Sequence, residues 1–277
     1  MKQIRFFLPV VILILVSIAC STSLLKQSTP TPLPTATLQP TVAPVPTKKP
    51  TAPPPSPVTQ ISPEVTLHTI SETSELPKYI VDIEYPFLEN TPPGQGFNQM
   101  IDEIVHHQIE YLKIEAENSE EFRKENLPDA SSGLYIRYQL TNDTNGLLSV
   151  LMDISVYIVG AAHPAPLTRT INYDLKEDAQ VELADLFKPG SNYLQTLSDY
   201  SIQSLRNSDT LDFEEGADPT IHNYRNWNVE THGLLITFEP YQVAPYAAGI
   251  QSVHIPFSVF SDIIAPDGPL ALFPVGK

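Results

Sequence analysis

After residue 63 the chain alternates between apolar and polar residues, and this alternation predicts β-strands. Residues 64–89 are expected to form two strands. The second carries four apolar residues on one face, Tyr79, Val81, Ile83 and Tyr85. Beyond a Pro-Pro-Gly break the apolar spacing changes to three and four residues, which is typical of a helix face. That face consists of Phe97, Ile101, Ile104, Val105, Ile109 and Leu112.

Two long strands are predicted next. Apolar residues alternate along residues 134–140 and again along residues 148–158. A polar segment ending in Asn145-Gly146 separates them, and Asn-Gly is a strong signal for a hairpin turn. The second strand is apolar on both faces, so we expect it to be covered on both sides and central in a sheet.

Shorter elements complete the pattern. Further strands are predicted at residues 170–175, 180–183, 234–238 and 253–255. A second helix is expected to begin after Ser191, a suitable N-cap. Strands and helices come in blocks rather than in strict βαβ alternation. The sequence therefore predicts an α+β fold with mainly antiparallel sheets and two principal packed helices.

Charge divides the chain in two. All 32 acidic residues follow residue 63, together with only 11 of the 16 basic ones, so residues 64–277 carry a formal net charge of −21. Such a surface repels nucleic acid and anionic lipid, and it attracts cationic partners. Solubility alone is the other explanation of this charge.

The first 20 residues predict export. Lys2 and Arg5 precede an apolar run at residues 6–16, and Ser17-Ile18-Ala19 leads to Cys20, the only cysteine. The motif resembles the bacterial lipobox, with Ser17 where Leu is usual. We expect residues 1–20 to be a lipoprotein signal peptide with Cys20 as the lipidation site. The acyl chains would anchor the protein to the lipid bilayer, on the extracytoplasmic face of a bacterial membrane. An uncleaved signal anchor is the alternative.

Residues 21–63 consist mainly of Pro, Thr, Ser, Ala and Val, without acidic or aromatic residues. Proline fixes φ and lacks an N–H donor, so this segment is expected to be a disordered linker. As a polyproline-like chain it would extend on the order of 130 Å, at roughly 3.1 Å per residue. It is interpreted as a tether, or else as a tail without a spacing role.

Several short motifs follow one another over about residues 160–265. They are Gly-Ala-Ala-His at 160–163, Asn-Tyr-Asp-Leu at 172–175, Leu-Ala-Asp-Leu-Phe at 183–187, the tyrosine-containing stretch 238–249 and Val-His-Ile-Pro at 253–256. Together they resemble the RsiV-like C-terminal domain family, domain of unknown function 3298. The preceding segment resembles, in pattern and position, its companion module, domain of unknown function 4163. We therefore expect a strand–helix–strand module at 64–158 and the RsiV-like domain at 159–277.

This resemblance implies a PdaC/RsiV-like extracytoplasmic α+β module. Such modules occur in surface lipoproteins, beside polysaccharide deacetylase domains, and as the outer part of an anti-sigma factor that binds lysozyme. No catalytic role is implied for the module itself. A deacetylase domain and a cytoplasmic sigma-binding segment are expected to be absent from this chain, so those two functions are not carried over. Ala161 departs from the family's usual second glycine, which bears on whether the backbone has positive φ there.

Three residues are candidates for ligand or partner binding. His163 lies on the Gly-Ala-Ala turn, and Tyr241 and Tyr246 lie on a loop between two strands. The alternatives are a histidine that only fixes the turn and tyrosines that pack the end of a sheet. His106 and His107, each four residues from a glutamate, are interpreted as a solvated helix face rather than as metal ligands. No metal, cofactor or nucleic-acid site is expected.

The sequence favours a non-catalytic acidic binding domain whose partner is a cationic protein such as a lysozyme. A cell-wall polysaccharide module using Tyr241 and Tyr246 is the alternative. A hydrolase acting on wall glycans is the third hypothesis, although the Gly-x-Ser-x-Gly motif and a phosphate-binding glycine loop are absent.

Overall fold

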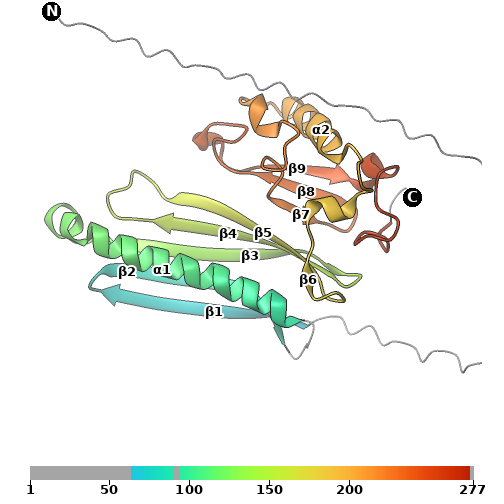
Figure 1. The fold of residues 1–277 in the computed structure, drawn as a ribbon. Coiled ribbons are helices and arrows are strands. Elements are labelled where there is room, and N and C mark those ends of the chain that lie inside the picture. Colours follow the sequence, from blue (N-terminus) through green and yellow to red (C-terminus); the bar gives the residue numbers. More distant parts are fainter. Residues whose placement is uncertain (1–63, 90–93, 275–277) are drawn as a thin grey trace, which may run out of the picture. The chain divides into compact units, whose positions relative to one another are not determined.

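The computed structural model describes residues 64–89 and 94–274, which form a six-stranded sheet and a three-stranded sheet, each with a helix nearby (Figure 1). The first sheet contains β1 (Glu64–Glu75), β2 (Lys78–Glu89), β3 (Ser132–Thr144), β4 (Leu147–Tyr157), β5 (Ala165–Asp174) and β6 (Ala179–Gln180) in that spatial order. The second contains β7 (Trp227–Val229), β8 (Gly233–Phe238) and β9 (Gln251–Pro256). The helices are α1 (Gln95–Asn126) and α2 (Tyr193–Asn207). The predicted α+β class is confirmed.

Neighbouring strands pair antiparallel throughout the described residues except at β2 and β3, which pair in parallel from Tyr79 and Ser132 onward. The exception follows from α1, which joins these two strands. A strand that leaves one end of a sheet and returns through a long helix enters the sheet again in the same direction. The other connections inside the first sheet are short turns, which reverse the chain.

The β3–β4 hairpin turns at the predicted dipeptide. Asn145 and Gly146 have φ values of 59° and 79°, as a two-residue hairpin turn requires. β3 continues up to that turn, so the polar residues before it belong to the strand. β4 pairs with both β3 and β5, and its first six residues are buried. The prediction that this strand is central is confirmed.

Helix α1 lies along one face of the first sheet (Figure 1). Its predicted apolar face is largely buried, and it packs with Val81, Ile83 and Leu134 in one core cluster. The helix extends 14 residues beyond Leu112, to Asn126. Over this extension the same face is continued by Ala116, Glu120 and Arg123, which are also buried.

The second core surrounds β7, β8, β9 and α2. Its largest fully buried side chains are aromatic, and Trp227, the only tryptophan of the chain, is 5% exposed. The predicted N-cap of α2 is wrong, because the helix begins at Tyr193 with Asn192 in the capping position. The strand predicted at 180–183 is also shorter than expected. It ends at Gln180, and a 3₁₀ turn over Leu183–Leu186 follows.

A buried polar junction joins the two sheets. Asn172 of β5 accepts hydrogen bonds from Ser149 Oγ at 2.6 Å and from Val229 N at 3.2 Å, and its Nδ2 donates to Trp227 O at 2.8 Å. Asn228 Nδ2 donates to Ser149 Oγ and to Val150 O. Within the described residues, β7 is therefore fastened to β4 and β5 through side-chain amides.

The first sheet extends past residue 158, where the sequence places a module boundary, because β5 and β6 pair onto β4. The division at 158/159 stays a prediction. The predicted signal peptide, Cys20 and the linker 21–63 lie outside the described residues. Among the described helices, none combines the length and apolarity needed to cross a membrane.

Candidate functional site

The three predicted binding residues lie together at the surface. The rings of His163 and Tyr246 are stacked with centroids 4.1 Å apart, and those of Tyr241 and Tyr246 are 5.7 Å apart. Tyr241 is 64% exposed, His163 is exposed and Tyr246 is half-buried. The structure thus brings together side chains that are about 80 residues apart in the sequence. We call these three residues the aromatic cluster.

One carbonyl holds the cluster together. Tyr246 Oη donates a hydrogen bond to Pro164 O at 2.9 Å, and His163 Nδ1 contacts the same oxygen at 2.9 Å. A carbonyl oxygen only accepts, so Nδ1 carries the proton and Nε2 is the ring nitrogen left for another contact. The cluster is therefore both a local support for the turn and an exposed group of rings.

Backbone geometry at two positions shapes the cluster. Gly160, in the turn after β4, has φ of 99°, a conformation that favours glycine. Ala161 is not among the described residues with positive φ, so alanine fits where the family usually has a second glycine. Tyr241 itself has φ of 67°, which is uncommon outside glycine.

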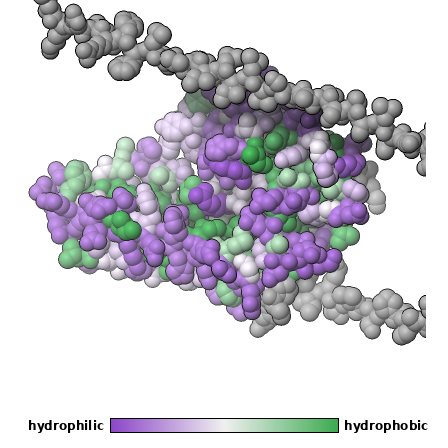
Figure 2. Space-filling model, in the orientation of Figure 1, coloured by the Kyte–Doolittle hydropathy of each residue, from purple (hydrophilic) through white to green (hydrophobic). Residues whose placement is uncertain are grey.

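The unit that carries the cluster is strongly acidic, and most of its basic side chains are already paired. Seven of the ten described Lys and Arg residues contact a carboxylate. Unpaired carboxylates therefore dominate the exposed charge. Polar side chains predominate on the face shown in Figure 2, with apolar patches between them. Such a surface supports association with cations.

A groove begins beside His163. It runs between α1 and the β4–β5 hairpin and has a volume of about 610 Å³. Its helical wall includes His107, Gln108 and Tyr111, while its strand wall includes Leu167 and Arg169. A second hollow of about 430 Å³ adjoins it and shares His107, Gln108 and Arg169. Neither Gln108 nor Arg169 was predicted as a site residue.

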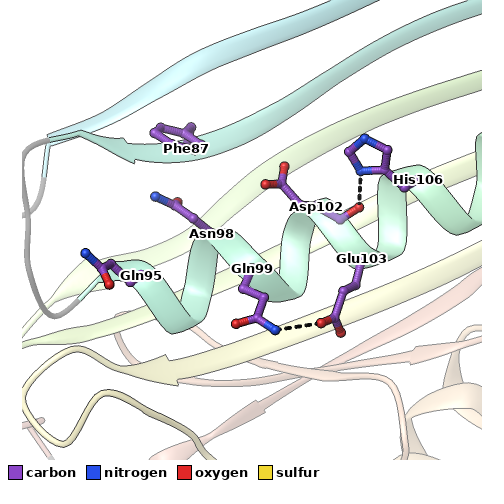
Figure 3. Close-up of a pocket in the computed structure, with 7 residues that line it drawn as sticks. All are labelled: Phe87, Gln95, Asn98, Gln99, Asp102, Glu103 and His106. Carbon is purple, nitrogen blue, oxygen red and sulfur yellow. Dashed lines mark hydrogen bonds between the residues drawn. The ribbon is translucent and has the colours of Figure 1, made fainter.

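Another hollow, of about 540 Å³, lies between Phe87 and the first turns of α1 (Figure 3). Its polar side chains are mostly engaged with protein atoms. Asn98 bonds both backbone groups of Leu88, at 2.9 and 3.0 Å. Gln99 Nε2 donates to Glu103 at 2.9 Å, and His106 Nδ1 lies 2.7 Å from Asp102 O. This hollow has fewer free groups for a ligand than the groove beside His163.

The described residues contain no group of three His, Cys, Asp or Glu side chains placed to hold a metal ion. His106 is exposed and bonded to its own helix, as expected for a solvated helix face. His107 lies at the groove described above.

The sequence motifs outside the aromatic cluster support the fold. Asn172 joins the two sheets, as described. Tyr173 is 2% exposed and donates to Asp178 at 2.9 Å, and burial together with this carboxylate raises the pKa of Tyr173 to about 12. Asp174 accepts from the backbone N–H groups of the next turn. In the Leu-x-Asp-Leu-Phe motif, Asp185 and Glu182 form a reciprocal capping box.

Comparison with known proteins finds two families along the chain. Residues 184–258 match the family described as a protein of unknown function, DUF3298, and residues 71–165 match the family described as Deacetylase PdaC. The second match covers most of the segment that was expected to be the companion module.

Two Bacillus subtilis strain 168 proteins are similar to the chain. The peptidoglycan-N-acetylmuramic acid deacetylase PdaC is 24% identical over 188 residues, which are 66% of this chain and 38% of that protein. The anti-sigma-V factor RsiV is 23% identical over 194 residues, which are 66% of this chain and 65% of that protein. The chain thus spans less than two thirds of either relative.

A crystal structure of a DUF3298 family member from Bacteroides fragilis NCTC 9343 has a similar fold. Its TM-score is 0.54 at 15% identity, and the match covers 76% of this chain and 96% of that one. The RsiV-like resemblance predicted from the motifs is therefore confirmed: the chain contains a DUF3298-like segment preceded by a PdaC-like one.

Proposed function

We propose that this chain is a non-catalytic binding module on the extracytoplasmic side of a bacterial membrane, anchored through lipidated Cys20, and that its partner is a cationic protein such as a lysozyme. The similarity to RsiV supports a protein partner, and the similarity to PdaC supports a place near peptidoglycan. The Pro/Thr-rich residues 21–63 would hold the binding unit away from the membrane.

The exposed aromatic cluster carries this proposal. Tyrosine provides a large apolar surface with a polar tip at a low cost in side-chain entropy, and it is enriched in protein interfaces. Tyr241 leaves 64% of its surface exposed while its ring borders Tyr246. A partner that covers these rings would bury apolar surface that the isolated chain leaves in water.

The charge of the unit selects the class of partner. With a formal charge of −21 after residue 63, long-range attraction favours a basic protein over an acidic one. At physiological ionic strength the Debye length is about 8 Å, so added salt should weaken the attraction strongly. Salt sensitivity therefore separates this proposal from binding that depends on ring stacking alone.

A glycan is the second candidate, favoured by the same rings. Aromatic faces in an open cluster suit sugar rings as well as protein side chains, and PdaC is named for an activity on peptidoglycan. Binding of this kind depends little on salt. For catalysis the cluster offers less support, because His163 Nδ1 is bonded to a backbone carbonyl rather than to an orienting carboxylate.

Calorimetry tests the protein partner. The full chain is titrated with lysozyme at low and at moderate salt, alongside Tyr241→Ala and Tyr246→Ala. Tyr135→Ala is the matched control, since Tyr135 is a 42% exposed tyrosine on β3. We expect binding that weakens with salt and falls at least about tenfold in the two cluster variants but not in the control. Absence of binding heat at both salt concentrations would contradict the lysozyme proposal.

A second experiment tests the anchor. The Cys20→Ser chain should lose its acyl groups and leave the membrane fraction when cells are fractionated. Retention of this variant in the membrane fraction, with a mass that shows no cleavage before residue 20, would favour the uncleaved signal anchor instead.

A further inference from the structure

We propose that the groove between α1 and β5 binds an N-acetyl amino sugar that carries a carboxylate, with Gln108 recognising the acetamido group and Arg169 the carboxylate. This site adjoins the aromatic cluster and shares His163 with it, but it does not include Tyr241 or Tyr246. It extends the glycan candidate to a second place on the chain, and it is independent of the cationic-partner proposal.

Gln108 is a buried polar side chain without a partner. Only 7% of the residue is exposed, yet its amide makes no hydrogen bond to any described residue. It lies where the groove and its adjoining hollow meet, and it lines both. Neither its amide oxygen nor its amide nitrogen is among the fully enclosed polar atoms without a partner, so the amide stays open to solvent at the groove, where a ligand can replace water. A ligand amide could satisfy both its donor and its acceptor.

Arg169 is the one described arginine without a carboxylate partner. The other four, Arg123, Arg137, Arg206 and Arg225, each contact Asp or Glu. Arg169 makes one hydrogen bond, from Nη1 to Thr168 O at 3.2 Å, which leaves most of its donors available. In a unit with so many acidic residues, an unpaired guanidinium at a groove is suited to a carboxylate from outside the chain.

The walls of the groove indicate a sugar. Tyr111 and His163 provide rings, while Val156, Ile158 and Leu167 provide apolar surface. Binding sites for small molecules commonly combine such apolar and aromatic linings with a few polar groups, in volumes of roughly 300–1,000 Å³. A volume of about 610 Å³ is within that range, and it leaves room beyond what a short N-acyl amino acid would fill.

The pairing of β4 with β5 explains the position of Arg169. Arg169 lies opposite Met152, and Leu167 lies opposite Ile154, so the side chains of β5 at these positions share the sheet face that α1 covers. One carboxylate, Glu115, also lines the groove, about two helical turns along α1 from Gln108, and it would repel an anion placed near it. The ligand carboxylate is therefore expected at the Arg169 end, with the sugar ring toward Tyr111 and His163.

Titration of the full chain, observed by backbone amide NMR, tests this proposal. The probes are N-acetylmuramic acid, N-acetylglucosamine, which lacks the carboxylate, and N-acetylalanine, which lacks the sugar. We expect N-acetylmuramic acid to shift amides near residues 108 and 169 and to bind at least about tenfold more tightly than either other probe. Arg169→Gln should remove its advantage over N-acetylglucosamine, and Gln108→Leu should weaken both sugars.

Matched controls lie on α2. Arg206→Gln and Gln195→Leu remove the same groups from exposed positions, and both should leave sugar binding unchanged. Arg169 is exposed, so its variant should fold even if Gln108→Leu does not.

The proposal is overturned by absence of shifts up to millimolar N-acetylmuramic acid, by equal binding of N-acetylglucosamine, or by undiminished binding to Arg169→Gln. Equal binding of N-acetylalanine would overturn the assignment to a sugar. Tyr241→Ala should leave sugar affinity unchanged, so this site and the aromatic cluster fail separately.

Discussion

Replacing Asn172 by alanine should destabilise the entire described unit, because this side chain joins the two sheets. Asn172 is 2% exposed, and its amide contacts Ser149, Trp227 and Val229 at 2.6, 2.8 and 3.2 Å. Alanine removes all three hydrogen bonds and leaves a small cavity. The loss therefore falls on both sheets rather than on one strand.

The magnitude follows from these contacts. A buried hydrogen bond contributes about 1 kcal/mol net, and a group left without a partner costs about 1–3 kcal/mol. Val229 N keeps a second acceptor, Ser149 Oγ at 3.0 Å, so its loss is partial. Trp227 O and Ser149 Oγ lose a donor and an acceptor respectively. We expect Asn172→Ala to lower the free energy of unfolding by about 3 kcal/mol, or the melting temperature by roughly 6–12 °C.

Trp227 makes the assay specific. It is the only tryptophan, and its backbone carbonyl accepts the bond from Asn172. Urea unfolding followed by tryptophan fluorescence reports on the junction, while far-ultraviolet circular dichroism reports on all strands and helices. In the wild-type chain the two transitions should coincide, because the sheets unfold together. In Asn172→Ala both transitions should move to lower urea, because the loss falls on both sheets.

The matched control is Asn207→Ala, which removes an exposed asparagine from the last turn of α2 and should change stability by less than about 0.5 kcal/mol. If Asn172→Ala loses less than about 1 kcal/mol, and its two transitions coincide at the wild-type urea concentration, the junction does not couple the sheets.

Two further predictions concern backbone strain and charge. Gly160→Ala should lower stability by about 1–2 kcal/mol in thermal denaturation. The φ of 99° at Gly160 disfavours other residues, and the new Cβ would lie 3.1 Å from the Phe122 ring. Ala161→Gly is the control. The hydrogen bond from Arg123 lowers the pKa of Glu120 from 4.5 to about 2. Ionised Glu120 therefore stabilises the fold above pH 4.5, and this contribution is lost as the pH falls from 4.5 toward 2. In urea unfolding, Glu120→Gln should therefore be less stable than wild type at pH 6, and the difference should narrow by pH 3; a constant difference would contradict this.

The apolar pattern predicted elements whose signal is local. The Asn145-Gly146 turn and the apolar face of α1 both depend on neighbouring residues, and both occur as predicted. The extension of α1 was missed, because Glu120 and Arg123 continue the buried face as an ion pair with N–O distances of 2.8 Å. A charged pair that satisfies itself can occupy core positions, and a count of apolar residues does not detect it.

Long-range contacts explain the remaining differences. β7 has three residues, and it is held by amides of Asn172 and Asn228 that bond to distant strands, so its own sequence carries little signal. The stacking of His163 on Tyr246 likewise depends on two loops meeting in the fold. Gln108 does carry a local signal. It is a polar residue three positions after buried Val105 and four before buried Leu112, and this helical spacing places it on the core-facing side of α1.

Some of the motifs by which the chain resembles RsiV-like domains belong to its core rather than to its surface. Asn172 and Tyr173 are buried, and each makes contacts that the fold needs. Two other motifs place side chains at the surface, on the turn after β4 and on the loop that carries Tyr241 and Tyr246, while the proposed groove runs along β5. Exposed positions of this kind can change without loss of the core, since function resides in sites placed on a fold. Relatives only 23% and 24% identical to this chain can therefore share its core while they differ in exposed side chains such as those of the proposed sites.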